Sequence, residues 1–205
     1  MKENGSNAKD PTNLMGGGLA AVLVGLSMLF IGCGTATPRS VSQISPSADS
    51  HAPVTTHLSV SWAVEYRDLG SLKKASDLVV NGAITGVAAS TTNRGIPFTD
   101  FNVTEISVIY DPRSRGVVTS LVLHQTGGTV NGQMLQVDDD PLFQVGDNVI
   151  LFLHEFSPGH FYVVGGPTGR FVVDNSGTVH AINGEGVAVA TSTSKAQFVQ
   201  EIQQA

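Results

Sequence analysis

The chain has 205 residues, with 11 Lys and Arg against 17 Asp and Glu and a formal net charge of −6. No cluster of Lys or Arg occurs, and because neutralisation of phosphates needs a basic face, this balance argues against a nucleic-acid partner. The one cysteine allows no internal disulfide, so the folded part has to be stabilised by its hydrophobic core alone.

An export signal is predicted in residues 1–32. The stretch from residue 14 to residue 31 carries no charge, and its densest part, LAAVLVGLSMLFIG, has about the length of a signal-peptide hydrophobic region. It is short for a membrane span, which needs about 20 apolar residues. Lys2 and Lys9 are offset by Glu3 and Asp10, and this weak positive start leaves an uncleaved helical anchor as an alternative.

The segment ends in FIGCGTA, which resembles the lipobox of bacterial lipoproteins: Leu, a small residue, Gly or Ala, and then Cys. Gly32 and Cys33 fit this pattern, whereas Phe30 and Ile31 depart from it. The resemblance implies that Cys33 becomes the new N-terminus and is acylated, which would anchor the domain on the extracytoplasmic side of the cell membrane. Ordinary secretion by cleavage after Ala36 stays open, because GTA also has the small-x-small form. All three alternatives export the domain.

Residues 33–58 are expected to be a disordered tether. Ser, Thr, Pro and Ala dominate this segment, so it has too little apolar surface to offset the entropy of ordering. One folded domain is predicted over residues 59–205, a length that can enclose a sizeable core.

The domain is predicted to begin with a short helix over about residues 63–75, which Gly70 weakens. Residues 77–90 then carry apolar side chains on both faces of a strand. Residues 99–110 alternate too, but the apolar face changes partway along. A β-bulge near Thr104 and Glu105 would restore the phase and bend this strand.

Five further strands are predicted, over residues 117–125, 148–155, 160–165, 170–173 and 178–182. Residues 148–155 are the most apolar and are expected to be central. A final helix is predicted from a capping box, Ser194 with Gln197, and from buried Phe198, Val199 and Ile202. These elements predict a mainly β fold, a small OB-like or partly closed antiparallel β-barrel with a short N-terminal helix and a C-terminal helix.

The succession SDLVVNG, TDFNVTEISVIYD and PLFQVGDNVILFL, within residues 72–182, resembles uncharacterised exported domains of bacteria. Such domains have the outline of the OB-like barrel of netrin and TIMP-type modules. TIMP-type inhibitors present a free N-terminal cysteine amine to the zinc of a metalloprotease. Here Cys33 lies outside the barrel and would be acylated, and the supporting disulfides are absent. The resemblance therefore implies a fold and not protease inhibition.

The segment HEFSPGH contains three candidate metal ligands, His154, Glu155 and His160. A zinc protease places H-E-x-x-H on a helix so that both histidines reach one metal. Here the spacing is longer, and Pro158 followed by Gly159 predicts a tight turn between two strands. Glu155 and His160 are then expected to face each other across the loop as a polar pair, with His154 on the opposite face.

Two other motifs are predicted to be loops. VDDDP contains Asp138, Asp139 and Asp140, which could ligate calcium, but the EF-hand spacing is not matched and a solvated acidic loop is favoured. GGPTGR lacks the Lys and the following helix of a phosphate-binding loop, since Arg170 leads into a strand.

No set of acid, base and nucleophile can be assembled from the domain. The predicted function is therefore a surface-tethered, non-enzymatic binding or structural module of the cell envelope, without a cofactor. Its partner would be an envelope protein, a glycan or a small ligand, with Trp62 and Tyr162 as candidate contact residues. Packing of Trp62 on the first helix is the other reading of that residue. A metal-dependent hydrolase that uses His154, Glu155 and His160 is the alternative function.

Overall fold

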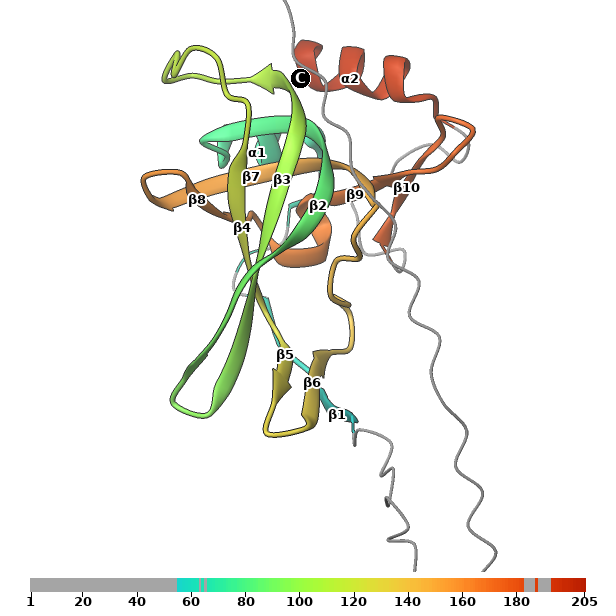
Figure 1. Cartoon of the computed structure of the whole chain (residues 1–205). Coiled ribbons are helices and arrows are strands. Elements are labelled where there is room, and N and C mark those ends of the chain that lie inside the picture. Colours follow the sequence, from blue (N-terminus) through green and yellow to red (C-terminus); the bar gives the residue numbers. More distant parts are fainter. Residues whose placement is uncertain (1–54, 63, 65, 183–186, 188–192) are drawn as a thin grey trace, which may run out of the picture. The chain divides into compact units, whose positions relative to one another are not determined.

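The computed structural model describes residues 55–62, 64, 66–182, 187 and 193–205 (Figure 1). These residues form a mainly β fold with a helix near each end, which confirms the predicted fold class. In chain order the elements are β1 (Thr55–Leu58), α1 (Leu69–Lys74), β2 (Leu78–Asn93), β3 (Ile96–Tyr110), β4 (Leu121–Thr126), β5 (Gly128–Val130), β6 (Gln133–Val137), β7 (Asn148–Ser157), β8 (His160–Val163), the 3-10 helix η1 (Gly166–Gly169), β9 (Arg170–Val173), β10 (Val179–Ala181) and α2 (Lys195–Gln204).

Seven strands form the large sheet, in the order β10-β9-β7-β2-β3-β4-β8. Strand β8 also pairs with β7, so β2, β3, β4, β8 and β7 form a ring of hydrogen-bonded strands. The β4–β8 pairing is parallel and joins only two residue pairs, Val122 with His160 and Leu123 with Phe161. The ring is therefore only partly closed.

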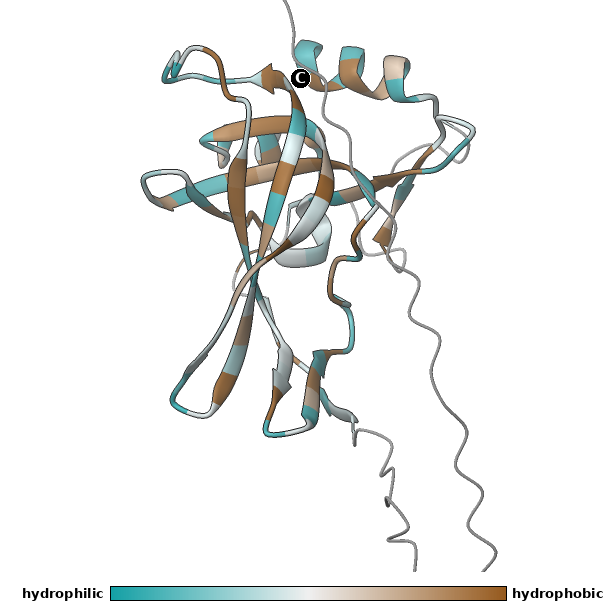
Figure 2. Cartoon of the chain, viewed as in Figure 1, coloured by the Kyte–Doolittle hydropathy of each residue, from teal (hydrophilic) through white to brown (hydrophobic). Residues whose placement is uncertain are grey.

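Burial on both faces explains why the sequence of the central strand β7 is almost continuously apolar. Leu151 and Leu153 face the core inside the ring, whereas Ile150 and Phe152 face a second core that includes side chains of α1 and α2. Figure 2 shows hydrophobic residues along β2, β3, β4 and β7. Both faces of the strand are buried, so its apolar residues do not alternate with polar ones.

The predicted β-bulge is confirmed. The register between β2 and β3 shifts where residues 81–83 face residues 104–107. Glu105, in this gap, has a φ of 54°. Gly82 lies across from it, and a Cβ there would lie 2.8 Å from the Val103 side chain. The extra residue reverses the alternation along β3, as the change of apolar face in the sequence had indicated.

The first helix is shorter than predicted, since it begins at Leu69 and not near residue 63. Asp68 has extended backbone angles, and its Oδ1 accepts a hydrogen bond from the Ser71 backbone N at 2.7 Å. This cap sets the start of the helix. The described residues from Thr55 to Arg67, here called the N-terminal strap, contain strand β1 and do not extend the helix.

The end of the predicted tether is ordered. Thr55–Leu58, placed in the tether, pair in parallel with β6, so ordered structure begins before residue 59. The glycine-rich segment after β4 is the β5–β6 hairpin, in which Asn131 and Gly132 have φ values of 51° and 76° and form the turn. Strands β1, β6 and β5 make a separate three-stranded sheet. The strand predicted over residues 117–125 begins only at Leu121.

Within the part of the chain that is described, no helix is both long and apolar enough to cross a membrane. Cys33, the leader and residues 33–54 of the predicted tether lie outside the described residues.

Candidate ligand-binding cleft

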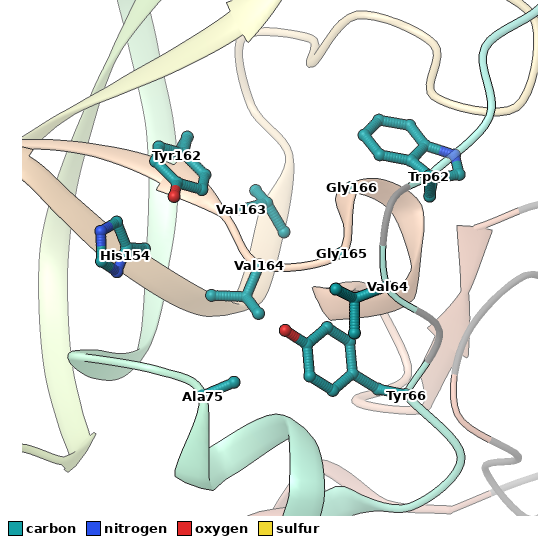
Figure 3. Close-up of a pocket in the computed structure, with 10 residues that line it drawn as sticks. All are labelled: Trp62, Val64, Tyr66, Ala75, His154, Tyr162, Val163, Val164, Gly165 and Gly166. Carbon is teal, nitrogen blue, oxygen red and sulfur yellow. The ribbon is translucent and has the colours of Figure 1, made fainter.

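A cleft of about 410 Å³ lies between the N-terminal strap and the β7–β8 hairpin (Figure 3). Trp62 and Tyr66 come from the strap, and His154 and Tyr162 come from β7 and β8. Ala75, three valines, Gly165 and Gly166 complete its lining. The cleft thus brings the two candidate contact residues, Trp62 and Tyr162, together with one candidate metal ligand, His154.

The aromatic rings of the strap pack on two consecutive glycines. Gly165 and Gly166 have φ values of 68° and 58°, a region that other residues rarely adopt. A Cβ on Gly166 would lie within 2.5 Å of three carbon atoms of the Trp62 ring, and one on Gly165 would lie 2.9 Å from Tyr66. Each ring therefore packs directly on glycine backbone. GGPTG is thus both a turn and the packing surface of the Trp62 ring.

Two aspartates of VDDDP hold the strap in place. The Trp62 indole Nε1 donates a hydrogen bond to Asp139 Oδ2 at 2.6 Å. On the neighbouring residue, Asp138 Oδ2 accepts from the Ser59 hydroxyl at 3.0 Å, and Asp138 Oδ1 lies 2.8 Å from His57 Nδ1. Two carboxylates thus bind the segment that leads from β1 into the cleft.

The third aspartate, Asp140, is buried and pairs with the buried Arg170. Its Oδ1 accepts a hydrogen bond from Arg170 Nη1 at 3.1 Å, and burial raises the pKa of Asp140. Arg170 is only 3% exposed, donates to the Pro141 carbonyl, and lies over the Phe143 ring at 3.6 Å from its centroid. The prediction of a solvated acidic loop is therefore wrong for Asp140. The three carboxylates diverge to separate partners and do not surround one cation position.

The HEFSPGH segment forms the predicted hairpin, with β7 and β8 joined at Pro158 and Gly159. The expected pairing of Glu155 with His160 is wrong, because the strands extend to the turn and His160 faces Ser157. Glu155 lies opposite Phe161, with a register shift between Glu155 and Ser157. The His160 Nδ1 lies 3.1 Å from the carbonyl of Pro158.

Glu155 belongs to an arginine-rich network on the outside of the hairpin. Its Oε2 accepts hydrogen bonds from Arg115 Nη2 at 3.0 Å and from Arg113 Nη1 at 3.1 Å. The hydrogen bond from Arg115 lowers the pKa of Glu155, so its charged form is favoured. Arg115 also binds Asp111 and the backbone carbonyl of Asp77. This network fixes the position of β7 relative to the loop after β3.

His154 is held by a different acid. Its Nδ1 lies 2.8 Å from Asp77 Oδ2, an oxygen that also accepts the Glu155 backbone N–H at 3.0 Å. The ring lies against Tyr162, with centroids 5.0 Å apart. Because Nδ1 faces Asp77, Nε2 is the ring nitrogen that remains for a ligand in the cleft.

The three predicted metal ligands of the hairpin therefore have three different sets of partners. Among the residues that the structure describes, no group of three or more His, Cys, Asp or Glu side chains could hold a metal ion. The cleft also has no Ser, Thr or Cys among its described lining residues. Asp77 and Tyr66 were missed from the sequence, because no local spacing links them to residues of the distant hairpin.

No protein-family model matches the chain, and no match was found among curated proteins.

Proposed function

We propose that the domain is a non-enzymatic binding module of the cell envelope, and that its cleft binds a neutral carbohydrate. The observation that supports this most directly is the composition of the cleft. Trp62, Tyr66 and Tyr162 present aromatic rings, and His154 and the tyrosine hydroxyls supply polar atoms. A sugar ring has apolar C–H faces that pack on aromatic rings, and hydroxyls that need hydrogen-bond partners.

The surrounding charge favours a neutral ligand over an anionic one. Asp77 lies behind His154, and Asp138 and Asp139 hold the strap that carries Trp62. The chain as a whole has a net charge of −6. An anionic ligand would approach against this field, whereas hydroxyl groups can donate to carboxylates.

Fluorescence titration tests this proposal, because Trp62 is the only tryptophan of the chain. Neutral sugars should change its emission in a saturable manner, and Tyr162→Ala should weaken binding about tenfold through the loss of one aromatic contact. Val145→Ala is the matched control, since Val145 is 63% exposed and does not line the cleft. If no neutral sugar gives saturable binding by fluorescence or calorimetry, the proposal fails.

We further propose that the domain is exported and held at the membrane by a lipid on Cys33. The FIGCGTA segment supports this, together with the uncharged stretch before it and the Ser/Thr/Pro-rich tether that follows. Two acyl chains would give stable anchoring, which a single chain does not. Cys33→Ser should release the domain from the membrane fraction or leave the uncleaved precursor. Mass analysis of the mature N-terminus decides the matter: Met1 would indicate an uncleaved anchor and Thr37 plain secretion.

A further inference from the structure

A second hollow, of about 300 Å³, adjoins the cleft. The two share part of their lining, Trp62, Tyr162, Val163 and Gly166. Beyond the shared residues, the second hollow is lined by His124 and its neighbours on β4 and by Asp140. Tyr162, which is 43% exposed, therefore belongs to both.

A row of rings includes two residues that line the second hollow, Tyr162 and His124. From Tyr162 it continues to Phe156 at 6.2 Å between centroids, to His124 at 5.5 Å and to Phe98 at 4.9 Å. At its other end Tyr162 contacts His154 at 5.0 Å. Phe156 is a large apolar side chain, and yet it is 50% exposed. Contiguous exposed apolar surface of this kind marks an interaction site.

Two histidines of the row, His154 and His124, repeat the same chemistry. His154 Nδ1 lies 2.8 Å from an oxygen of Asp77, and His124 Nδ1 lies 2.5 Å from an oxygen of Asp100. Each histidine ring also contacts an aromatic ring, as described above. A ligand built from repeated units could place one unit at each histidine and meet equivalent groups there.

We propose that the carbohydrate is a linear oligosaccharide that extends from the cleft, across Tyr162 and Phe156, to His124. This inference rests on the proposed carbohydrate-binding function and adds the length and direction of the ligand. A polymer with repeating sugar units fits the repeated aromatic and histidine–aspartate pairs.

The arrangement of strands disfavours an extended peptide as the occupant. A peptide that adds to a sheet needs a free strand edge for its backbone hydrogen bonds. Strands β3, β4, β8 and β7, which carry the row, each have a neighbour on both sides. Single-stranded nucleic acid stacks on aromatic rings, but needs a positive groove, and here Asp77 and Asp100 flank the row.

The test is a calorimetric titration of the full chain with β-1,4-linked N-acetylglucosamine, glucose and mannose oligomers of increasing length. We expect the affinity to rise about tenfold or more from the disaccharide to the longest oligomer of the series that binds. Phe156→Ala and His124→Ala should each weaken the affinity for the long oligomer by about threefold to tenfold. Their effect on the disaccharide should be smaller, whereas Trp62→Ala should weaken both ligands. Val145→Ala serves as the control, and melting temperatures report that each variant is folded.

Two results overturn the inference, and they can be told apart. If the disaccharide binds as tightly as the long oligomer and Phe156→Ala changes neither affinity, the ligand does not extend past Tyr162, although the proposed function stands. If no oligomer of the three series binds, the carbohydrate-binding function and its extension both fail.

Discussion

Substitution of Gly166 by alanine tests whether the Trp62 ring depends on the bare backbone beneath it. The new methyl group would lie within 2.5 Å of three carbons of the indole. Gly177→Ala is the matched control, because Gly177 has a φ of 81° and nothing lies within 4 Å of the position of its Cβ. Both variants force an alanine into the left-handed region, but only Gly166→Ala collides with a side chain.

The difference between the two variants can be estimated. The left-handed conformation costs alanine about 1–2 kcal/mol at either position. At Gly166, the indole also has to move by about 1 Å or more to restore ordinary carbon–carbon contact of about 3.5 Å. Such a movement would break the 2.6 Å hydrogen bond from Trp62 to Asp139. A hydrogen bond to a charged group contributes about 1.5–3 kcal/mol. We therefore expect Gly166→Ala to lower the free energy of unfolding by about 1.5–3 kcal/mol more than Gly177→Ala does.

Thermal unfolding followed by circular dichroism measures this difference. For a domain of this size, 1 kcal/mol corresponds to about 2–4 °C, so the two melting temperatures should differ by roughly 3–12 °C. The emission of Trp62, the only tryptophan, reports the strap separately. It should shift to longer wavelength in Gly166→Ala because the indole becomes more exposed to water, and should stay unchanged in Gly177→Ala.

Equal melting temperatures for the two variants, with unchanged Trp62 emission in both, would refute this account of the strap. The same emission shift in Gly177→Ala would also contradict it, since Gly177 has no neighbour within 4 Å that a methyl group could displace.

Three further predictions concern groups that stabilise the fold. Arg170→Met leaves a buried carboxylate unpaired and should lower the free energy of unfolding in urea by about 3–5 kcal/mol, whereas exposed Arg67→Met should change it by no more than about 0.5 kcal/mol. The hydrogen bond from Arg115 lowers the pKa of Glu155, so ionised Glu155 stabilises the fold above pH 4.5 and loses this effect as the pH falls through its lowered pKa. Glu155→Gln should therefore melt below the wild type at pH 7, with a gap that narrows as the pH falls below 4.5. Ser194→Ala removes the cap of α2 and should cost about 1 kcal/mol in the same urea titration.

The elements of the fold could be predicted where their signal is local. The change of apolar face along residues 99–110 located the bulge, since the alternation of a strand records the face on which each residue lies. Pro158 and Gly159 predicted the hairpin, because a turn depends on the φ preferences of its own residues. Ser194 with Gln197 predicted the start of α2 for the same local reason.

Contacts between distant segments could not be predicted in this way. VDDDP has the composition of a solvated loop, but Asp139 lies 77 positions from Trp62 and Asp140 lies 30 positions from Arg170. Whether such a carboxylate faces water, an indole or a guanidinium depends on which strands become neighbours. The same applies to Glu155, whose partners Arg113 and Arg115 lie 42 and 40 positions away.

The sequence by itself determined the mainly β fold, the bulge, the hairpin turn and the C-terminal helix, because each follows from the periodicity or backbone preference of adjacent residues. Only the tertiary structure decided that Trp62 and Tyr66 pack on Gly165 and Gly166, and that His154 lies beside Asp77 and Tyr162. A cleft forms where segments remote in the chain meet, and the order and register of strands that bring them together depend on how the whole core packs.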